Sequence, residues 1–114
     1  MVSIHLSPFF QTRLKTTPDK LNAFCQRWQV IELGLFGSVL RDDFSPDSDV
    51  DVLIRFNSEA DRRWNLFDLI KMQHELEALF QRPVDLTESS SLQNPYRRAE
   101  ILQTQQVIYS SPPH

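Results

Sequence analysis

Two aspartates, Asp49 and Asp51, are the residues of this chain best placed to do chemistry. They stand at the start of an apolar run, residues 50–54, which predicts a strand. Side chains alternate between the faces of a strand and rise about 3.3 Å per residue, so we expect both carboxylates on one face, about 6.6 Å apart. Neighbouring carboxylates repel one another unless a cation lies between them. The pair therefore predicts a cation site.

A turn with phosphate-binding character precedes this pair. The chain has only two glycines, Gly34 and Gly37, and the second is followed by Ser38 at the end of an apolar run, residues 30–36. Such a run predicts a buried strand that ends in a loop. A glycine lets a ligand approach the backbone closely, and a short helix over residues 39–43 would point its N-terminal amides at the turn. Carboxylates beside a phosphate site favour Mg²⁺ as the cation.

The aspartates also have simpler interpretations. An Asp-rich segment is often only a solvated turn, and Asp47, Asp49 and Asp51 resemble the start of a calcium loop. The calcium interpretation fails because the sixth position is Val52 instead of glycine and the twelfth is Ser58 instead of glutamate. A solvated turn is left as the alternative to a catalytic or nucleotide-binding site.

A family resemblance rests on this spacing. Gly37 and Ser38, ten intervening residues, and then Asp49 and Asp51 match the signature of the DNA polymerase β-type nucleotidyltransferase superfamily. The motif covers about 15 residues and is fairly specific. The order of the expected elements resembles the superfamily from residue 18 to residue 109.

The small size of the chain narrows the resemblance. With the positions of Arg41 and Ser48, it makes the chain resemble the minimal nucleotidyltransferases, the antitoxin members of pairs whose toxin is a helical HEPN ribonuclease. One departure is Asp42, which stands where many relatives have glycine and affects the expected loop shape. The resemblance implies that the nucleotide is bound by Gly37, Ser38, Arg41 and Ser48. From the residues alone, Arg41 either contacts the triphosphate or faces solvent.

A third carboxylate completes the site that the resemblance implies. Residues 83–87 predict a short strand with Val84 and Leu86 on one face and Asp85 on the other. An aspartate is unfavourable in a strand, which favours a functional role for it. If this strand lies beside the second one, Asp85 joins Asp49 and Asp51 as catalytic residues that hold two Mg²⁺ ions.

The implied activity is the transfer of AMP from ATP to a tyrosine of the HEPN toxin, which would neutralise its ribonuclease activity. Gly37 and Ser38 would bind the outgoing phosphates, and Asp85 could help to deprotonate the acceptor hydroxyl. One alternative is an antitoxin that neutralises its partner by contact alone. A weaker alternative is an enzyme that acts on a small molecule or an RNA end.

Composition limits the other classes. The chain has 114 residues and a formal charge of -3, which indicates one domain and no broad nucleic-acid surface. The single cysteine, Cys25, cannot form an internal disulfide, and the N-terminus lacks a signal-peptide pattern, so we expect a cytoplasmic protein. No apolar run approaches the roughly 20 residues that span a membrane.

The remaining elements position this site. The expected fold is α/β (α+β), a small mixed sheet with helices packed on it, divided into an N-terminal arm (1–16), the nucleotidyltransferase domain (17–109) and a C-terminal tail (110–114). Residues 1–16 are either a short edge strand or an arm. Residues 107–109 predict a last strand.

Three helices are expected around the sheet. The first begins at Thr17, as N-cap, and carries the apolar stripe Leu21, Phe24, Cys25 and Trp28. The second covers residues 64–81, with core positions Leu66, Leu69, Met72, Leu76 and Leu79. The third covers residues 95–106, where Arg97 and Arg98 are either solvated or in contact with phosphates or an acidic partner.

Overall fold

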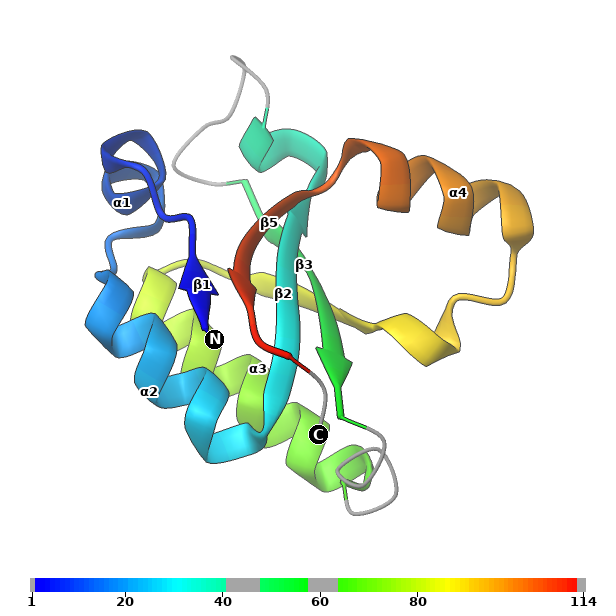
Figure 1. The fold of residues 1–114 in the computed structure, drawn as a ribbon, viewed down its shortest axis with the longest axis horizontal. Helices are drawn as coiled ribbons and strands as arrows, with labels where there is room; N and C mark the ends of the chain where they lie inside the picture. The colour runs from blue at the N-terminus through cyan, green and yellow to red at the C-terminus, as the bar shows by residue number, and fades with distance from the viewer. Residues whose placement is uncertain (1, 41–47, 58–63, 113–114) are drawn as a thin grey trace.

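The protein is described here by a computed structural model that covers residues 2–40, 48–57 and 64–112 (Figure 1). Its centre is a five-stranded sheet with the order β1-β5-β2-β3-β4. The strands are β1 (Ser3–Ile4), β2 (Val30–Phe36), β3 (Val50–Phe56), β4 (Val84–Glu88) and β5 (Gln106–Ser110). The helices are α1 (Pro8–Leu14), α2 (Pro18–Trp28), α3 (Leu66–Phe80) and α4 (Pro95–Thr104), with 3-10 turns η1 (Gly37–Leu40) and η3 (Ser89–Ser91).

The sheet is mixed, as expected. Strands β3 and β4 are parallel and are connected through α3, while β2 pairs antiparallel with both β3 and β5. A parallel pair needs such a crossover because the chain must return to the starting end of the sheet. The fold class predicted from the sequence, helices packed on a small mixed sheet, is confirmed.

Helix α2 begins where the sequence predicts. The side chain of Thr17 accepts a hydrogen bond from the Lys20 amide, and Pro18 occupies the first helical position, where a missing amide proton costs nothing. The helix buries the predicted stripe, which consists of Leu21, Phe24, Cys25 and Trp28. The positions of cap and stripe together confirm the sequence prediction for this helix.

One face of the sheet is closed by α2 and α3 (Figure 1). Met72 and Leu76 of α3 are fully buried there, as predicted, and Phe80 joins them. The prediction was wrong for Leu66, which is 68% exposed, while Leu69 and Leu79 are partly buried against the core. This face carries the main hydrophobic core, including Val50, Val52 and Ile54 of β3.

The opposite face is covered only in part, by α4 (Figure 1). Ile101 of α4 packs on Phe36 of β2 and Leu53 of β3 in a small separate cluster, with Leu92 at its side. Because Asp51 alternates with Val50 and Val52 along β3, it lies on this less covered face. The face that holds the candidate site is therefore not the face that holds the main core.

The N-terminal segment contains both an edge strand and a helix. Strand β1 pairs with β5, so the predicted edge strand exists. Helix α1 was not predicted, although Ser7 and Pro8 form the same cap-and-proline start as Thr17 and Pro18. Its last residue, Leu14, is fully buried, which ties this segment to the main core. No helix in the described ranges is both long and apolar enough to cross a membrane.

Candidate active site

Two of the three predicted carboxylates are brought together by strand register. In the parallel ladder between β3 and β4, Asp51 is the direct partner of Asp85. Adjacent strands lie about 4.8 Å apart, and partners in register project from the same face. The condition set for the third carboxylate, that its strand lies beside the second, is therefore confirmed. Asp85 is exposed and Asp51 is half-buried, so both are within reach of a ligand.

Asp49 stands at the entrance to this pair. It directly precedes β3 and is exposed, and the next residue, Val50, donates its amide to the carbonyl of Pro83 over 2.9 Å. That bond fixes the starts of β3 and β4 side by side. The hydroxyl of Ser38 lies 3.5 Å from the Asp49 carbonyl, so the glycine-serine turn and the acidic strand meet at this corner.

The glycine of the turn is required by its contact with Asp51. Gly37 has a φ of +77°, a conformation that residues with a side chain rarely adopt. A Cβ at this position would clash with Oδ2 of Asp51, which shows that this carboxylate lies directly over the glycine. The ladder that pairs Phe36 with Asp51 sets up this approach. The turn therefore faces the acidic residues, as the sequence pattern predicts.

The helix expected just after the turn lies only in part within the described residues. Residues 37–40 form the 3-10 turn η1, and residues 41–43 of the expected helix lie outside the described ranges. Val39 is fully buried and anchors this turn in the main core. Binding of phosphate by the amides of Gly37 and Ser38 stays a prediction.

A cleft of about 560 Å³ opens between this corner and α4. Gly37, Asp51, Phe36 and Leu40 line one side, and Arg97, Glu100, Ile101 and Thr104 of α4 line the other. From the sequence, phosphate contact was one of the alternatives for Arg97, whereas Glu100 and Thr104 were not assigned to the site. A signal existed in the spacing of Arg97, Glu100 and Thr104, which places them on one stripe of a helix.

Of the other two residues predicted to bind nucleotide, the structure describes Ser48 but not Arg41. Arg41 lies outside the described residues. Ser48 is half-buried and directly precedes Asp49, so it belongs to the same corner. Its predicted contact with nucleotide stays a prediction.

The carboxylates do not form a finished metal cage on their own. Within the described ranges, no three His, Cys, Asp or Glu side chains converge closely enough to hold a metal ion. Mg²⁺ in nucleotide sites takes one or two carboxylates and completes its shell with phosphate oxygens and water. Asp51 and Asp85, neighbours on one face with oxygen ligands only, fit that requirement.

The cysteine lies apart from this site. Cys25 is fully buried on the α2 face, and burial raises the pKa of its thiol far above the usual range. A thiol that keeps its proton is a poor nucleophile. The prediction that Cys25 is a core residue is confirmed.

Comparison with known proteins agrees with this geometry. Residues 19–108 match the family described as the nucleotidyltransferase domain. The chain is 39% identical over 69 residues to protein adenylyltransferase MntA of Thermococcus cleftensis, a match that covers 60% of this chain and 66% of that protein. The chain thus spans slightly less than two thirds of the length of that relative.

Two solved structures share the fold. One, provisionally described as a minimal nucleotidyltransferase, aligns with a TM-score of 0.63 and 27% identity over 77% of this chain and 85% of its own. Another, described as a toxin-antitoxin with AMP-PNP, aligns with a TM-score of 0.65 and 14% identity over 82% of this chain and 73% of its own. At that identity the second likeness concerns the fold alone.

Proposed function

The chain belongs to the nucleotidyltransferase domain family, and from this premise we propose that it is an antitoxin that transfers AMP from ATP to a partner toxin. It is an enzyme of the minimal nucleotidyltransferase type, similar to a protein named a protein adenylyltransferase. The proposed toxin is of the HEPN type, the acceptor is a tyrosine hydroxyl, and the modification neutralises the toxin's ribonuclease activity.

One observation carries this proposal. Asp51 is in register with Asp85 on a neighbouring parallel strand, and its carboxylate lies over Gly37 at the edge of the cleft. Acidic groups meet the glycine-serine turn there, and a carboxylate site beside a turn that could hold phosphate is the combination that nucleotidyl transfer needs. A solvated turn would require neither the register nor the close approach to glycine.

Asp51 and Asp85, with Asp49 beside them, would hold Mg²⁺. When bound, Mg²⁺ neutralises charge that develops on the attacking and leaving oxygens of a phosphoryl group. Residues of the chain would bind the remaining groups of the nucleotide. The amides of Gly37 and Ser38 would hold the outgoing phosphates, because both lie at the turn beside Asp51.

The proposed reaction balances as a simple displacement. A bond forms between the acceptor oxygen and the α-phosphorus of ATP, the bond from that phosphorus to the bridging oxygen breaks, and pyrophosphate leaves. The acceptor hydroxyl must lose a proton, and Asp85, the more exposed carboxylate of the register pair, would accept it. Solvent can then take the proton from the exposed carboxyl group.

A protein acceptor is supported by the openness of the site and by the relative's name. Asp49 and Asp85 are both exposed, so a side chain on the surface of another protein can reach them. The relative from Thermococcus cleftensis is named for adenylyl transfer to protein. The likeness to the toxin-antitoxin structure adds that this fold occurs in such a pair.

The test combines the chain, ATP, Mg²⁺ and the product of the neighbouring gene, and measures the intact mass of that product. We expect the partner to gain one or more adenylyl groups, and peptide mapping to place them on tyrosine. The matched control is the double variant Asp49→Ala with Asp51→Ala, which should transfer none.

Two outcomes would overturn the proposal. If the partner gains no mass and the double variant still neutralises it, the chain acts by contact alone. If an RNA end or a small molecule is modified without any protein partner, the acceptor class is wrong. Neutralisation is read out as loss of the partner's ribonuclease activity on a labelled RNA.

A further inference from the structure

We propose that Arg97 binds the triphosphate of the donor nucleotide from the α4 side of the cleft, opposite Asp51. This inference rests on the proposed function, because it concerns the substrate of the same site. It adds a residue and an element that neither the motif nor its spacing indicates.

The position of Arg97 is set by the way α4 packs. Ile101, which is 6% exposed, anchors the helix on Phe36 and Leu53. Arg97 lies four residues earlier, one helical turn away on the same side of the helix, and lines the cleft that Gly37 and Asp51 close from the sheet. Burial of Ile101 thus places the side chain of Arg97 at the cleft.

The charges of the cleft show why a cation is needed there. The charged side chains that line it within the described ranges are Asp51, Glu100 and Arg97, so Arg97 is the one positive group among them. A nucleoside triphosphate carries several negative charges and would be repelled by the carboxylates. Arginine is suited to this task because its planar guanidinium can donate two parallel hydrogen bonds to phosphate oxygens.

The guanidinium of Arg97 is also available. Its backbone amide donates to the side chain of Asn94 at the helix start, but its side chain has no hydrogen bond or ion pair with a described residue. An arginine that a fold uses as a brace would be engaged. Arg97 is instead exposed within reach of a ligand.

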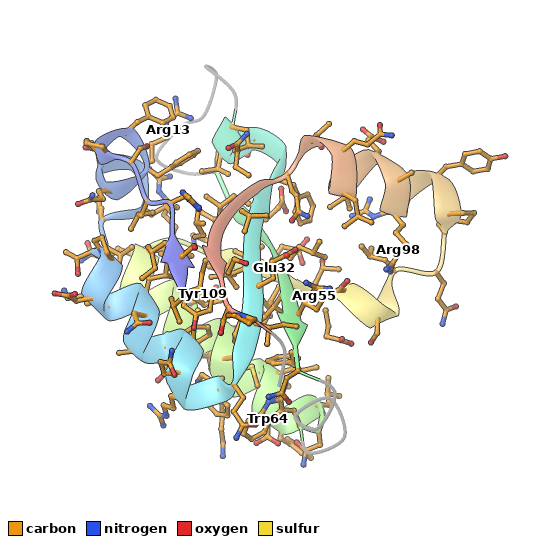
Figure 2. All side chains as sticks on the ribbon, viewed as in Figure 1. Arg13, Glu32, Arg55, Trp64, Arg98 and Tyr109 are labelled. Atoms are coloured by element: carbon orange, nitrogen blue, oxygen red, sulfur yellow. The ribbon has the colours of Figure 1, made fainter. Side chains whose placement is uncertain are left out.

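The next residue provides the contrast. The Nη1 atom of Arg98 donates to the carbonyl of Ser89 over 2.9 Å and ties α4 to the turn η3 (Figure 2). Arg98 does not line the cleft. Two adjacent arginines therefore have different tasks, because successive residues of a helix point in directions about 100° apart.

The experiment compares Arg97→Gln with Arg98→Gln in the full chain. Titration calorimetry with Mg²⁺ measures the Kd of α,β-methylene-ATP, which cannot be cleaved at the reacting bond, and of AMP. Loss of a charge-assisted hydrogen bond should weaken binding of the triphosphate by roughly ten- to one-hundredfold in Arg97→Gln. Binding of AMP should change by no more than about twofold, because its single phosphate reaches the reacting end only.

The control variant separates binding from stability. Arg98→Gln should bind the triphosphate like the wild type but unfold at a lower temperature, and Arg97→Lys should recover part of the lost affinity. If Arg97→Gln binds the triphosphate as the wild type does, or loses AMP equally, the inference is overturned while the proposed function stands. If the wild type binds neither nucleotide, both are overturned.

Discussion

The two faces of the sheet differ in what their residues do. The face under α2 and α3 is apolar and closed, and side chains from three strands and three helices are fully buried in its core. Among the described residues, the face under α4 has a small core of Phe36, Leu53 and Ile101 with Leu92 at its side, and this face carries Asp51, Asp85 and the cleft. Both faces come from the same strands, since residues alternate between them.

The difference shows how a short chain combines stability with an open acidic site. Burial of apolar area is the main source of stability, and the closed face supplies most of it. Carboxylates that must meet a ligand cannot be buried without a large desolvation cost. Placing them on the opposite face keeps that cost out of the main core. Substitutions on the two faces should therefore have separable effects.

The largest expected effect is on activity at the open face. Asp51→Asn should lower the proposed adenylyl transfer by about a thousandfold or more, because a neutral amide cannot replace a carboxylate that would hold Mg²⁺. The melting temperature should change little. Transfer is measured by intact mass over time, and the matched control is Glu32→Gln.

That control tests the comparison directly. Glu32 pairs with Arg55 over 3.2 Å on the surface of the sheet, away from the cleft, and Figure 2 labels both residues. An exposed ion pair of this kind contributes at most about 1 kcal/mol. Glu32→Gln should therefore keep full activity. Comparable loss in both variants would mean that the acidic character of the face matters, and not the position of Asp51.

The next largest effect is on stability at the closed face. Leu76→Ala should destabilise the fold by about 2–5 kcal/mol, because Leu76 is fully buried and its truncation leaves a cavity. This corresponds to a fall in melting temperature on the order of 10 °C. Below that temperature, transfer per folded molecule should equal that of the wild type. Calorimetry and the transfer assay check the two parts, and a loss of activity in the folded protein would break the separation.

A third prediction uses the two glycines. Gly37→Ala should cost about 1–2 kcal/mol through its positive φ, and should lower transfer by about a hundredfold because the new Cβ displaces Asp51. In Gly34→Ala the Cβ would meet the amide end of Gln105, a flexible side chain. That variant should lose stability but keep transfer.

A second substitution can rescue one of the two glycine variants but not the other. Adding Gln105→Ala to Gly34→Ala should restore part of the stability, because it removes the atoms that clash. No second substitution of that kind exists for Gly37, since the atom in the way belongs to Asp51 itself. Equal activity in the two single variants would contradict the functional contact between Gly37 and Asp51.

The smallest expected effect is on the pH dependence of the free energy of unfolding, and it comes from a residue of the closed face. Burial raises the pKa of the Cys25 thiol, so the folded protein keeps a proton that the unfolded chain loses above about pH 8.5. This contribution to stability is fully present below that pH and is lost as the pH rises, by up to about 1.4 kcal/mol per pH unit. Denaturant unfolding between about pH 8.5 and 10 should show a smaller slope in Cys25→Ala. An identical slope would contradict the burial of the thiol.

Local patterns in the sequence were sufficient to predict several helices and strands and the faces that they bury. Thr17 and Pro18 predicted the start of α2, and the apolar spacing after them predicted the residues that α2 buries. The alternation along residues 49–56 placed Val50 and Val52 in the core and Asp51 on the other face. Caps and periodicities act over a few residues, so the sequence by itself determines them.

Only the tertiary structure decided which distant residues meet. The parallel register puts Asp85 beside Asp51, the packing of Ile101 turns α4 toward the cleft, and one helical position separates Arg97 in the cleft from Arg98 at η3. Leu66 is likewise exposed despite its place on an apolar stripe of α3. Register and helix docking depend on how whole surfaces fit, and such long-range fits are not encoded in any short stretch of sequence.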